Sequence, residues 1–588
     1  MAGFASTEDL PGPATSLGGP APQPSAPPPA TRHVPRHAPR YAHVPRADDG
    51  ARHPVVVVGG GLVGLTVSLD LASHGQRVVL LDDDDTVSLG PHAVSFARRS
   101  LEIYARLGLG QLMLDNGVPW NTGRVFLGDR RLCDFPVLAE PGHQYPAFVN
   151  LPQSTLEQWL VEACQATGLV DLRWCHRVSG VENRPDGVAL RIEVPGGDYR
   201  LSADWLLACD GANSGVRQAL GLPFAGRAFH DRFLVADVAM RGDFPAERWF
   251  WFDPPFHRGG AVLLHRQPGD VWRIEFQIGW DADPEAECEP ARVGARLAAM
   301  LGPDVPFDLQ GASVHSFHCR RLERFRHGRT LFLGDSAHQE SPFGAHGGNA
   351  GVQDADNLGW KLAAVLRGDA PAALLDSYDQ ERTAASDLSI LESTRSADFI
   401  TPRHAAALAY RDAVLELAGY HAFARPLVNS GRLSHPATLH GSRLNTPDAG
   451  AWAGGLPPGT PAADAPVLCD GRADWLLRHL AADGFTLLLF GAPDEVPAAA
   501  LTAPAGRARP GSWPLRSVFV SPVEADGVLW DRDGLAAARY DAQPGTAVLL
   551  RPDQHVAARW RSFDPVAVAT ARRRALGTTA EARQHIPA

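Results

Sequence analysis

Three glycines and one acid near the start of the chain form a pattern that could bind a dinucleotide. Gly59, Gly61 and Gly64 follow four consecutive valines, and Asp82 ends the next apolar run. Glycine at these positions permits a tight turn, close approach of a pyrophosphate to the backbone, and packing of a helix on a strand. The helix N-terminus would stabilise phosphate charge, and the acid would accept from a ribose hydroxyl. The spacing predicts a dinucleotide-binding βαβ unit; a merely tight turn is the alternative.

Two further motifs place an acid directly after a predicted strand. Asp210 follows the apolar run 205–209, and Asp335 follows the run 330–333. A carboxylate at a strand end can accept hydrogen bonds from a polyol, although the Asp210 motif alone is equally compatible with a solvated turn. A glycine-rich loop, residues 342–351, then leads into a helix, so its backbone N–H groups could face an anionic or electron-rich ring.

Composition excludes several classes of function. The chain has 588 residues, which allows two to four domains at roughly 100–200 residues each. A net charge of −11 argues against a nucleic-acid partner. The single lysine, Lys361, follows Trp360 rather than glycine, which excludes a P-loop. The longest apolar stretch, residues 54–69, is too short and too rich in glycine for a membrane span, so no membrane partner is expected.

The cysteines indicate a reducing compartment. They are odd in number, scattered, and never spaced as CxxC, which argues against a disulfide scaffold, a zinc site or a dithiol redox motif. We find no secretory signal at the N-terminus, so a cytoplasmic location is expected. The sequence also offers no obvious set of metal ligands, so no metal site is predicted. The seven cysteines are Cys133, Cys164, Cys175, Cys209, Cys288, Cys319 and Cys469.

Three motifs in this order resemble those of the flavoprotein aromatic hydroxylases, the class A FAD monooxygenases. The chain is most similar to the branch with phenol hydroxylases and 3-(3-hydroxyphenyl)propionate hydroxylase. Besides the dinucleotide, Asp-Gly and Gly-Asp motifs, the segments 99–103, 153–157 and 374–382 match. The resemblance covers roughly residues 54–400, and the C-terminal part resembles that branch more loosely.

The resemblance implies an α/β fold with an α+β insert. Residues 1–50, rich in Pro, Ala, His and Arg, are expected to form a disordered leader. A Rossmann-like FAD-binding domain would span 51–400, with a β-sheet substrate domain inserted at about 230–318. A helical connection would follow at 401–440. Residues 441–588 would form a small thioredoxin-like domain, in which the redox cysteine pair is absent.

The resemblance also assigns roles to individual residues. Gly59, Gly61, Gly64 and Asp82 would hold the ADP half of FAD, whereas Arg99 and Gln153 would contact the flavin side. Asp210 would serve both FAD and the nicotinamide nucleotide, and Asp335 would hold the ribityl chain. Pro342 and the amides of three residues would line the isoalloxazine ring, and His346 is a further catalytic candidate, facing either the flavin or solvent. Those three residues are Gly347, Gly348 and Asn349.

The implied reaction is hydroxylation of a phenolic aromatic substrate. NADH or NADPH would reduce the tightly but non-covalently bound FAD as a transient co-substrate, and O₂ would react through a flavin C4a-hydroperoxide. The family is compatible with a homodimer. An NAD(P)H oxidase, a non-hydroxylating flavin-binding protein and a halogenase are the alternatives, although the only lysine lies on the cofactor-side helix rather than between flavin and substrate.

The sequence allows two interpretations of several residues in the predicted substrate domain and the flavin motif. The run 249–252, together with His257, Arg258 and His265, could line an aromatic pocket with an anion clamp or could be a strand buried on both faces. His338 is expected to support the flavin motif or to pack beneath it rather than to act as a base.

Overall fold

The structure confirms the predicted βαβ unit. In this computed structural model, β1 (Arg52–Val58) and β2 (Val78–Leu81) pair in parallel and are joined through α1 (Leu62–Ser73). Val55, Val56 and Val57 are fully buried, as expected for a strand that lies between two others inside a parallel sheet. The residues described are 40–42, 51–88, 93–137, 140–241, 245–302, 304–428, 435–493 and 513–579.

The first sheet is built around these strands in the order β17-β18-β11-β1-β2-β8, and β10 and β9 form a hairpin extension of β11. Its other strands are β8 (Val170–Arg173), β9 (Arg177–Asn183), β10 (Val188–Val194), β11 (Gly197–Ala208), β17 (Arg326–His327) and β18 (Thr330–Phe332). The strands from β18 to β8 are all parallel, so their carboxyl ends meet at one edge, where open α/β sheets bind ligands.

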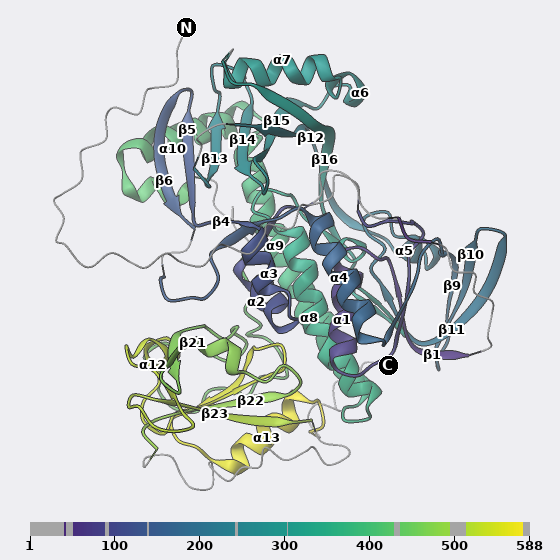
Figure 1. The fold of residues 1–588 in the computed structure, drawn as a ribbon, viewed down its shortest axis with the longest axis vertical. Coiled ribbons are helices and arrows are strands. Elements are labelled where there is room, and N and C mark those ends of the chain that lie inside the picture. The colour runs from purple at the N-terminus through teal and green to yellow at the C-terminus, as the bar shows by residue number, and fades with distance from the viewer. Residues whose placement is uncertain are drawn as a thin grey trace, which may run out of the picture.

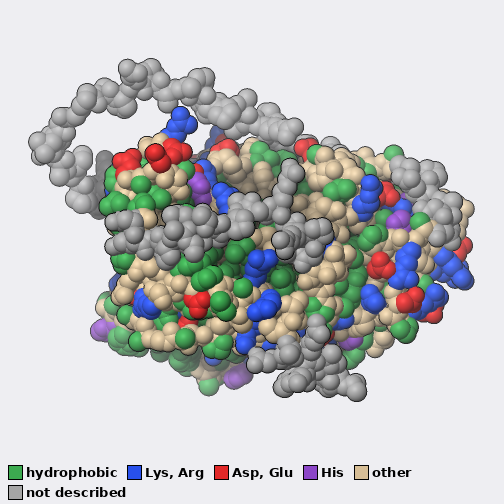
Figure 2. All heavy atoms as spheres, turned by 90° about the horizontal axis from the view of Figure 1, so that it is seen from below, with side chains coloured by type: hydrophobic (Ala, Val, Ile, Leu, Met, Phe, Trp, Pro, Cys, Tyr) green, Lys and Arg blue, Asp and Glu red, His purple; other side chains and the backbone are tan. Residues whose placement is uncertain are grey.

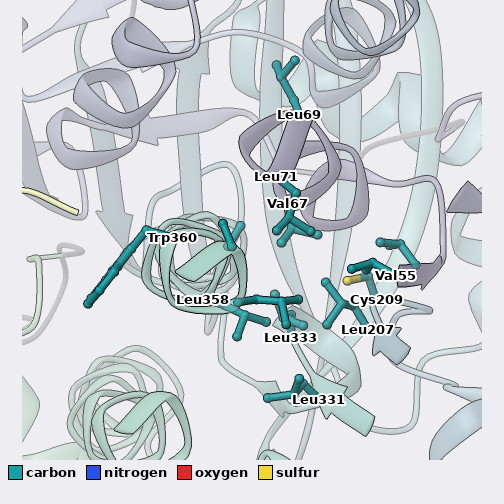
Figure 3. Close-up of a cluster of buried hydrophobic side chains, with 14 of the residues drawn as sticks. Val55, Val67, Leu69, Leu71, Leu207, Cys209, Leu331, Leu333, Leu358 and Trp360 are labelled. Atoms are coloured by element: carbon teal, nitrogen blue, oxygen red, sulfur yellow. The ribbon is translucent and has the colours of Figure 1, made fainter. Parts of the chain in front are cut away.

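Helices cover the first sheet and create its core. The helix α8 (Gly347–Leu366) runs through the centre of the molecule beside α1, and α4 (Gln153–Thr167) packs on the other side of α1 (Figure 1). Figure 3 shows Val55 and Leu207 from the strands, Val67 from α1 and Leu358 from α8 meeting in one apolar cluster. The short α5 (Gly215–Ala219) follows the strand β11.

The second sheet has the order β19-β16-β12-β15-β14-β13-β5-β6. Its strands are β5 (Thr122–Leu127), β6 (Arg130–Pro136), β12 (Ala225–Met240), β13 (Arg248–Phe252), β14 (Ala261–Arg266), β15 (Val271–Gly279), β16 (Phe307–Arg321) and β19 (His338–Gln339). The helices α6 (Pro284–Glu287) and α7 (Pro290–Leu301) lie over one face, at the top of Figure 1. The other face packs toward the glycine-rich loop, because Phe343 of that loop contacts Phe233 of β12.

The second sheet is wider than the insert predicted at about 230–318. The strands β12 and β16 reach Ala225 and Arg321, and β5 and β6 come from much earlier in the chain. The pairing explains this difference, since β13 lies parallel to β5 over Arg248–Phe252 and Gly123–Leu127. Without β5, β13 would be an exposed edge strand, and the sheet covers that edge with a hairpin from the preceding segment.

A small sheet joins the two large ones. It has the order β3-β7-β4, with β3 (Ser95–Ala97), β4 (Val118–Trp120) and β7 (Phe148–Asn150). The helices α2 (Arg98–Arg106) and α3 (Gly110–Asn116) follow β3. The turns η1 (Gly334–Ser336) and η2 (Ala372–Leu375) flank α8, and α9 (Asp376–Ile400) continues the chain.

The segment 401–440 is helical over much of its described length. It contains α10 (Ala405–Tyr420) and η3 (Ala422–Leu427), and α10 packs on β6 of the second sheet. Residues 429–434 lie outside the described part. Within the described part of the chain, no helix has the combination of length and apolar character that a membrane crossing requires.

The C-terminal domain has its own seven-stranded sheet, in the order β21-β20-β24-β23-β22-β25-β26. The strand β23 is parallel to β22, whereas β25 and β26 are antiparallel and a helix follows, which is the strand pattern of the thioredoxin fold. Its elements are β20 (Pro466–Cys469), β21 (Arg472–Trp475), η4 (Leu476–His479), β22 (Phe485–Phe490), β23 (Leu515–Ser521), β24 (Leu529–Trp530), α12 (Leu535–Tyr540), β25 (Ala547–Leu550), β26 (Val556–Trp560) and α13 (Pro565–Ala575).

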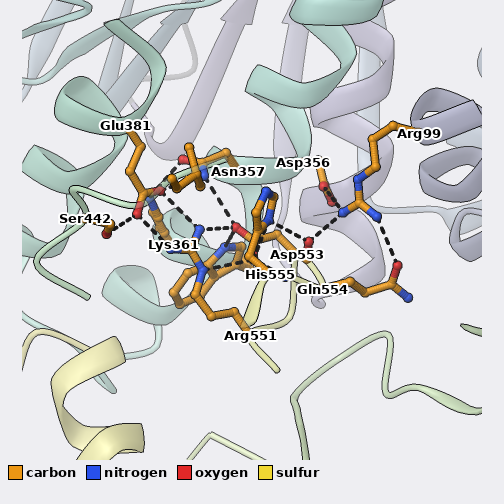
Figure 4. A network of polar contacts seen from close by, with 12 residues as sticks. Arg99, Asp356, Asn357, Lys361, Glu381, Ser442, Arg551, Asp553, Gln554 and His555 are labelled. Carbon is orange, nitrogen blue, oxygen red and sulfur yellow. Dashed lines mark hydrogen bonds and ion pairs between the residues drawn. The ribbon is translucent and has the colours of Figure 1, made fainter. Parts of the chain in front are cut away.

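A buried polar network fixes this domain to α8 and α9 (Figure 4). Glu381 of α9 accepts from Lys361 Nζ at 2.6 Å and from Arg551 Nη1 at 2.7 Å. Asp553 accepts from Arg551 Nε at 2.9 Å and from Trp360 Nε1 at 3.1 Å. Lys361, the only lysine of the chain, therefore shares Glu381 with Arg551 of the C-terminal domain.

The molecular surface seen from below carries mixed charge. On the face in Figure 2, arginine side chains are interspersed with acidic and apolar ones. Such an arrangement agrees with the net charge of −11 and differs from the basic stripe of nucleic-acid-binding proteins.

Candidate cofactor site

A cavity of about 500 Å³ lies at the carboxyl ends of β1, β2 and β11. Its walls include the glycines 59–61, Asp82, Asp210 and Ser88. The dinucleotide and Asp-Gly motifs, far apart in the sequence, therefore line one space, because the parallel strands that carry them are neighbours.

Two of the predicted glycines have no room for a side chain. Gly59 has φ +104°, and a Cβ there would lie 2.3 Å from the carbonyl oxygen of Cys209. A Cβ on Gly64 would lie 1.9 Å from the carbonyl oxygen of Gly59, which brings α1 close against β1. Gly61 precedes the first turn of α1 and provides no side-chain cap, so the N-terminal amides of the helix remain available to a phosphate.

Asp82 lies at the end of β2, where the motif requires an acid. Its carboxylate accepts from the backbone N–H of Gly60 and, at 2.8 Å, from that of Asp84. Burial raises the pKa of Asp82 to about 7 even though both hydrogen bonds favour the ionised form. A hydroxyl donor from a ligand would stabilise the carboxylate further.

Asp210 faces the same cavity from the end of β11. Its Oδ2 accepts from Val216 N at 2.9 Å, whereas Oδ1 is buried with no hydrogen-bond partner in the described part of the chain. Burial raises the pKa of Asp210. An unsatisfied buried carboxylate oxygen at a cavity wall fits a site that a ligand hydroxyl completes.

The third motif lies beside the N-terminus of α1. A Cβ on Gly348 would be 3.5 Å from Leu62, the first residue of α1, and one on Gly347 would be 3.9 Å from Asp335 Oδ1. Asp335 and Pro342 are exposed, although neither is among the residues that line the cavity. The loop thus continues the surface of the cavity past α1.

The loop before α8 contains one alanine in a conformation that favours glycine. Ala345 has φ +58°, in the left-handed region that residues other than glycine seldom adopt. Asn349 fixes this conformation, since its Nδ2 donates to the carbonyls of Ala345 at 2.6 Å and Ser95 at 2.9 Å. Its Oδ1 accepts from Ala97 N at 2.8 Å. The side chain of Asn349 therefore shapes the loop, and only its backbone amide is left for a ring.

Arg99 is not among the residues that line this cavity. The side chain is 3% exposed, and its Nη2 donates to Asp553 O at 2.6 Å and lies 3.3 Å from Asp356. Its Nη1 reaches Gln554 at 3.3 Å. The C-terminal domain thus engages the guanidinium, and the contact of Arg99 with the flavin side of the cofactor stays a prediction.

Gln153 supports the cavity wall through other residues. Its Oε1 accepts from Ala93 N at 3.1 Å, and its Nε2 donates to Glu157 at 2.8 Å. Glu157 in turn accepts from the backbone and side chain of Ser88, which lines the cavity.

The two histidines of the third motif are both buried. His346 is 2% exposed and contacts Ser389 Oγ of α9 at 3.2 Å, so its ring points toward α9 rather than solvent. His338 lies between Asp354 at 2.7 Å and Glu340 at 3.0 Å. Although burial alone lowers it, these carboxylates raise the pKa of His338 to about 10. Asp354 also accepts from Gly334 N at 2.9 Å, so this group supports the motif from below.

A short piece of the predicted leader reaches the rim of the cavity. Arg40 Nη1 lies 2.7 Å from Asp85, and Tyr41 N donates to Asp85 O at 2.6 Å. The Tyr41 ring stacks on Trp174 with centroids 4.5 Å apart. Residues 40–42 are therefore ordered, in contrast to the prediction of a disordered leader. The remaining residues of the leader lie outside the described part, and only the aromatic side chain at 41 marked this anchor in the sequence.

Comparisons with known proteins agree with this geometry. Residues 52–390 match the FAD binding domain family. A 3-(3-hydroxy-phenyl)propionate/3-hydroxycinnamic acid hydroxylase of Mycolicibacterium smegmatis is 28% identical over 86% of this chain and 90% of its own length. A para-nitrophenol 4-monooxygenase of a Pseudomonas species is 33% identical over 56% of this chain and 82% of its own.

Solved structures show the same fold. The p-nitrophenol 4-monooxygenase of Pseudomonas putida aligns with a TM-score of 0.57 at 28% identity, over 64% of this chain and 96% of its own. The flavin-dependent monooxygenase PieE, solved with FAD and substrate, aligns with a TM-score of 0.75 at 23% identity, over 91% of this chain and 100% of its own. Since the family match spans more than half of the chain and contains all three motifs, the chain belongs to the FAD-binding domain family of flavoprotein aromatic hydroxylases.

Proposed function

We propose that the chain hydroxylates a phenolic aromatic compound, with FAD held non-covalently and NADH or NADPH as a transient reductant. One observation carries the proposal: two half-buried carboxylates, Asp82 and Asp210, face one cavity beside a βα turn in which Gly59 and Gly64 leave no room for a side chain. Bound FAD supplies electron transfer from the reductant and activation of O₂, for which side chains alone are unsuited.

Different residues of the cavity and the glycine-rich loop would bind different parts of FAD. The turn at Gly59 and Gly61 and the N-terminus of α1 would hold the pyrophosphate, and Asp82 would accept from the ribose. The free Oδ1 of Asp210 would accept a second hydroxyl of the cofactor. Asp335 would hold the ribityl chain, and Pro342 with the amides of residues 347–349 would line the flavin ring.

The chain also supplies an apolar wall beside the flavin loop. Phe343 packs against Phe233 and Phe317 of the second sheet, with ring centroids 4.8 and 5.5 Å apart. These phenylalanine side chains would exclude water beside the flavin ring, which would favour oxygen transfer to a substrate over loss as peroxide.

The proposal is tested with the purified full-length protein, loaded with FAD and mixed with NADH or NADPH. A hydroxylase oxidises the reductant faster when a phenol is present and yields hydroxylated product in proportion. Oxidation that yields only peroxide with every phenol tested would identify an oxidase. If neither nucleotide reduces the flavin, the chain is a flavin-binding protein without this activity. Formation of peroxide alone and an unreduced flavin would each contradict the proposal.

We expect FAD affinity to fall with decreasing pH because of Asp82. Its pKa of about 7 means that the free site is protonated below neutral pH, whereas a ribose donor requires the carboxylate. Affinity should therefore be about 10-fold weaker at pH 6 than at pH 8. Titration of the apoprotein with FAD, followed by flavin fluorescence, measures this slope. The variant Asp82→Asn should lose this pH dependence, and Asp129→Asn, at an exposed site between β5 and β6, should keep it. If the pH dependence persists in Asp82→Asn, another group binds the proton.

We expect Tyr41→Ala to accelerate the release of FAD. The variant removes the stack on Trp174 that anchors residues 40–42 beside the cavity wall at Thr86. Loss of an aromatic pair of about 1 kcal/mol corresponds to roughly 5-fold faster release. Flavin fluorescence after dilution measures the rate. Tyr410→Ala, at an exposed site on α10, is the control. If both variants release FAD at the same rate, the contact between Tyr41 and Trp174 does not help to retain the cofactor.

A further inference from the structure

An arginine in the second sheet is buried without a hydrogen bond. Arg248, the first residue of β13, is 3% exposed, and within the described residues its guanidinium makes no hydrogen bond or ion pair. Its guanidinium carbon lies 5.0 Å from the centre of the Phe250 ring, and the negative charge of Glu275 partly offsets its burial. Arginine carries five N–H donors, and because Glu275 accepts none of them, they remain available to an anion that the chain itself does not supply.

The neighbours of Arg248 already have partners of their own. The next strands place His265 and then Arg273 directly across from it. His265 Nε2 lies 3.3 Å from Glu275, and Arg273 donates to Asp237 at 2.8 and 2.9 Å. Although burial opposes it, His265, Arg248 and Arg273 lower the pKa of Glu275 to about 2. Arg248 is thus the arginine of this row whose donors are unused, and the ring nitrogens of His265 also make no hydrogen bond within the described residues.

The register of β13 turns Arg248 toward the flavin loop. Side chains alternate along a strand, so Arg248 shares a face with Phe250 and Phe252, whereas Trp249 and Trp251 take the opposite face. Phe250 and Phe252 belong to the buried cluster that includes Phe343 of the glycine-rich loop. Trp251 belongs instead to the cluster with Val293 and Leu297 of α7.

A chain of hydrogen bonds connects this face to the start of α8. Asn349 Nδ2 donates to Ser95 O at 2.9 Å, and Ser95 Oγ donates to Asn150 Oδ1 at 2.7 Å. Asn150 Nδ2 then donates to Arg266 O, at the end of β14 beside His265, at 2.8 Å. The Trp120 ring, which donates to Asn150, stacks on Phe148 and gives this region an aromatic lining.

We propose that Arg248 binds the carboxylate of an aromatic acid, so that the substrate is a phenol with an acidic side chain. The inference rests on the proposed hydroxylase function. A carboxylate accepts two parallel N–H bonds from a guanidinium, and the substrate ring would lie among the phenylalanines of the same face. The other candidates for an anion clamp are unsuited, since Arg258 is exposed and paired with Asp253 and His257 contacts the Gln277 carbonyl at 2.6 Å.

The test compares two phenols that differ in charge. The FAD-loaded enzyme is titrated with 3-(3-hydroxyphenyl)propionate and with 3-ethylphenol, and binding is followed through the flavin absorbance spectrum. The wild type should bind the acid more tightly. In Arg248→Met the acid should bind at least about 30-fold more weakly, whereas 3-ethylphenol should change by less than about 3-fold. Arg248→Lys should recover part of the loss, because it keeps the charge without the paired donors.

Arg258→Met is the matched control, because it removes an exposed arginine from the same sheet and should change neither affinity. Steady-state kinetics of Arg248→Met should show a higher KM for the acid with a nearly unchanged kcat, as expected for lost binding.

Three results would overturn the inference. The first is a wild type that binds the neutral phenol but not the acid, which needs no variant. The second is equal weakening of both ligands in Arg248→Met, and the third is no weakening of the acid. If FAD binds but neither phenol accelerates oxidation of the reductant, the hydroxylase function itself is wrong, whatever Arg248 binds.

Discussion

Replacing Gly64 with alanine is expected to abolish retention of FAD. The added Cβ would lie 1.9 Å from the carbonyl oxygen of Gly59, so either α1 moves away from β1 or the turn between them changes shape. Both movements displace the backbone amides that receive the pyrophosphate, since those amides belong to this turn and to the first turn of α1. We expect a loss of FAD affinity of at least about 100-fold, and overpacking of about 1–3 kcal/mol in stability.

The measurement is the flavin content of the purified protein, from its visible absorbance, together with thermal unfolding. Gly294→Ala is the control, because this glycine lies within α7 and a Cβ there meets nothing within 4 Å. The control should keep its flavin and gain up to about 1 kcal/mol in helix stability. A Gly64→Ala protein that purifies with a full complement of FAD would show that the cofactor binds elsewhere.

Local sequence patterns predict the cofactor end of this molecule because its determinants are local. The valines of β1, the glycines of the turn and Asp82 at the end of β2 lie within about thirty residues, and each has a conformational reason to be there. Asp210 is harder to place by itself. Its position beside Asp82 follows from the parallel pairing of β11 with β1, which brings a distant strand end to the same cavity.

Contacts between distant segments account for what the sequence does not reveal. Arg99 has the position of a cofactor ligand in the motif, but its partners Asp553 and Gln554 are in the C-terminal domain. Arg248 is adjacent to aromatic residues and has the appearance of a solvated strand end. Only the pairing of β13 with β5 and β14 places its side chain inside.

Replacing Arg551 with methionine is expected to weaken the attachment of the C-terminal domain. The guanidinium is fully buried and donates to two carboxylates, Glu381 on α9 and Asp553 on its own domain. Although burial opposes it, Arg551 and Lys361 hold the pKa of Glu381 well below its ordinary value. Without the arginine, two carboxylates share one buried lysine. Leaving a buried charge uncompensated costs about 3–5 kcal/mol, which we expect as the loss in free energy of unfolding.

Denaturant unfolding and limited proteolysis measure this loss, with Arg532→Met as the control. Arg532 belongs to the same domain and pairs with Asp533, but both side chains are exposed, so its loss should leave the free energy of unfolding nearly unchanged. Addition of Glu381→Gln to Arg551→Met should cost less than the sum of the two single changes, because the second substitution removes a charge that the first left unpaired. Strict additivity, or equal stability of the Arg551 and Arg532 variants, would mean that apolar packing rather than this network holds the domains together.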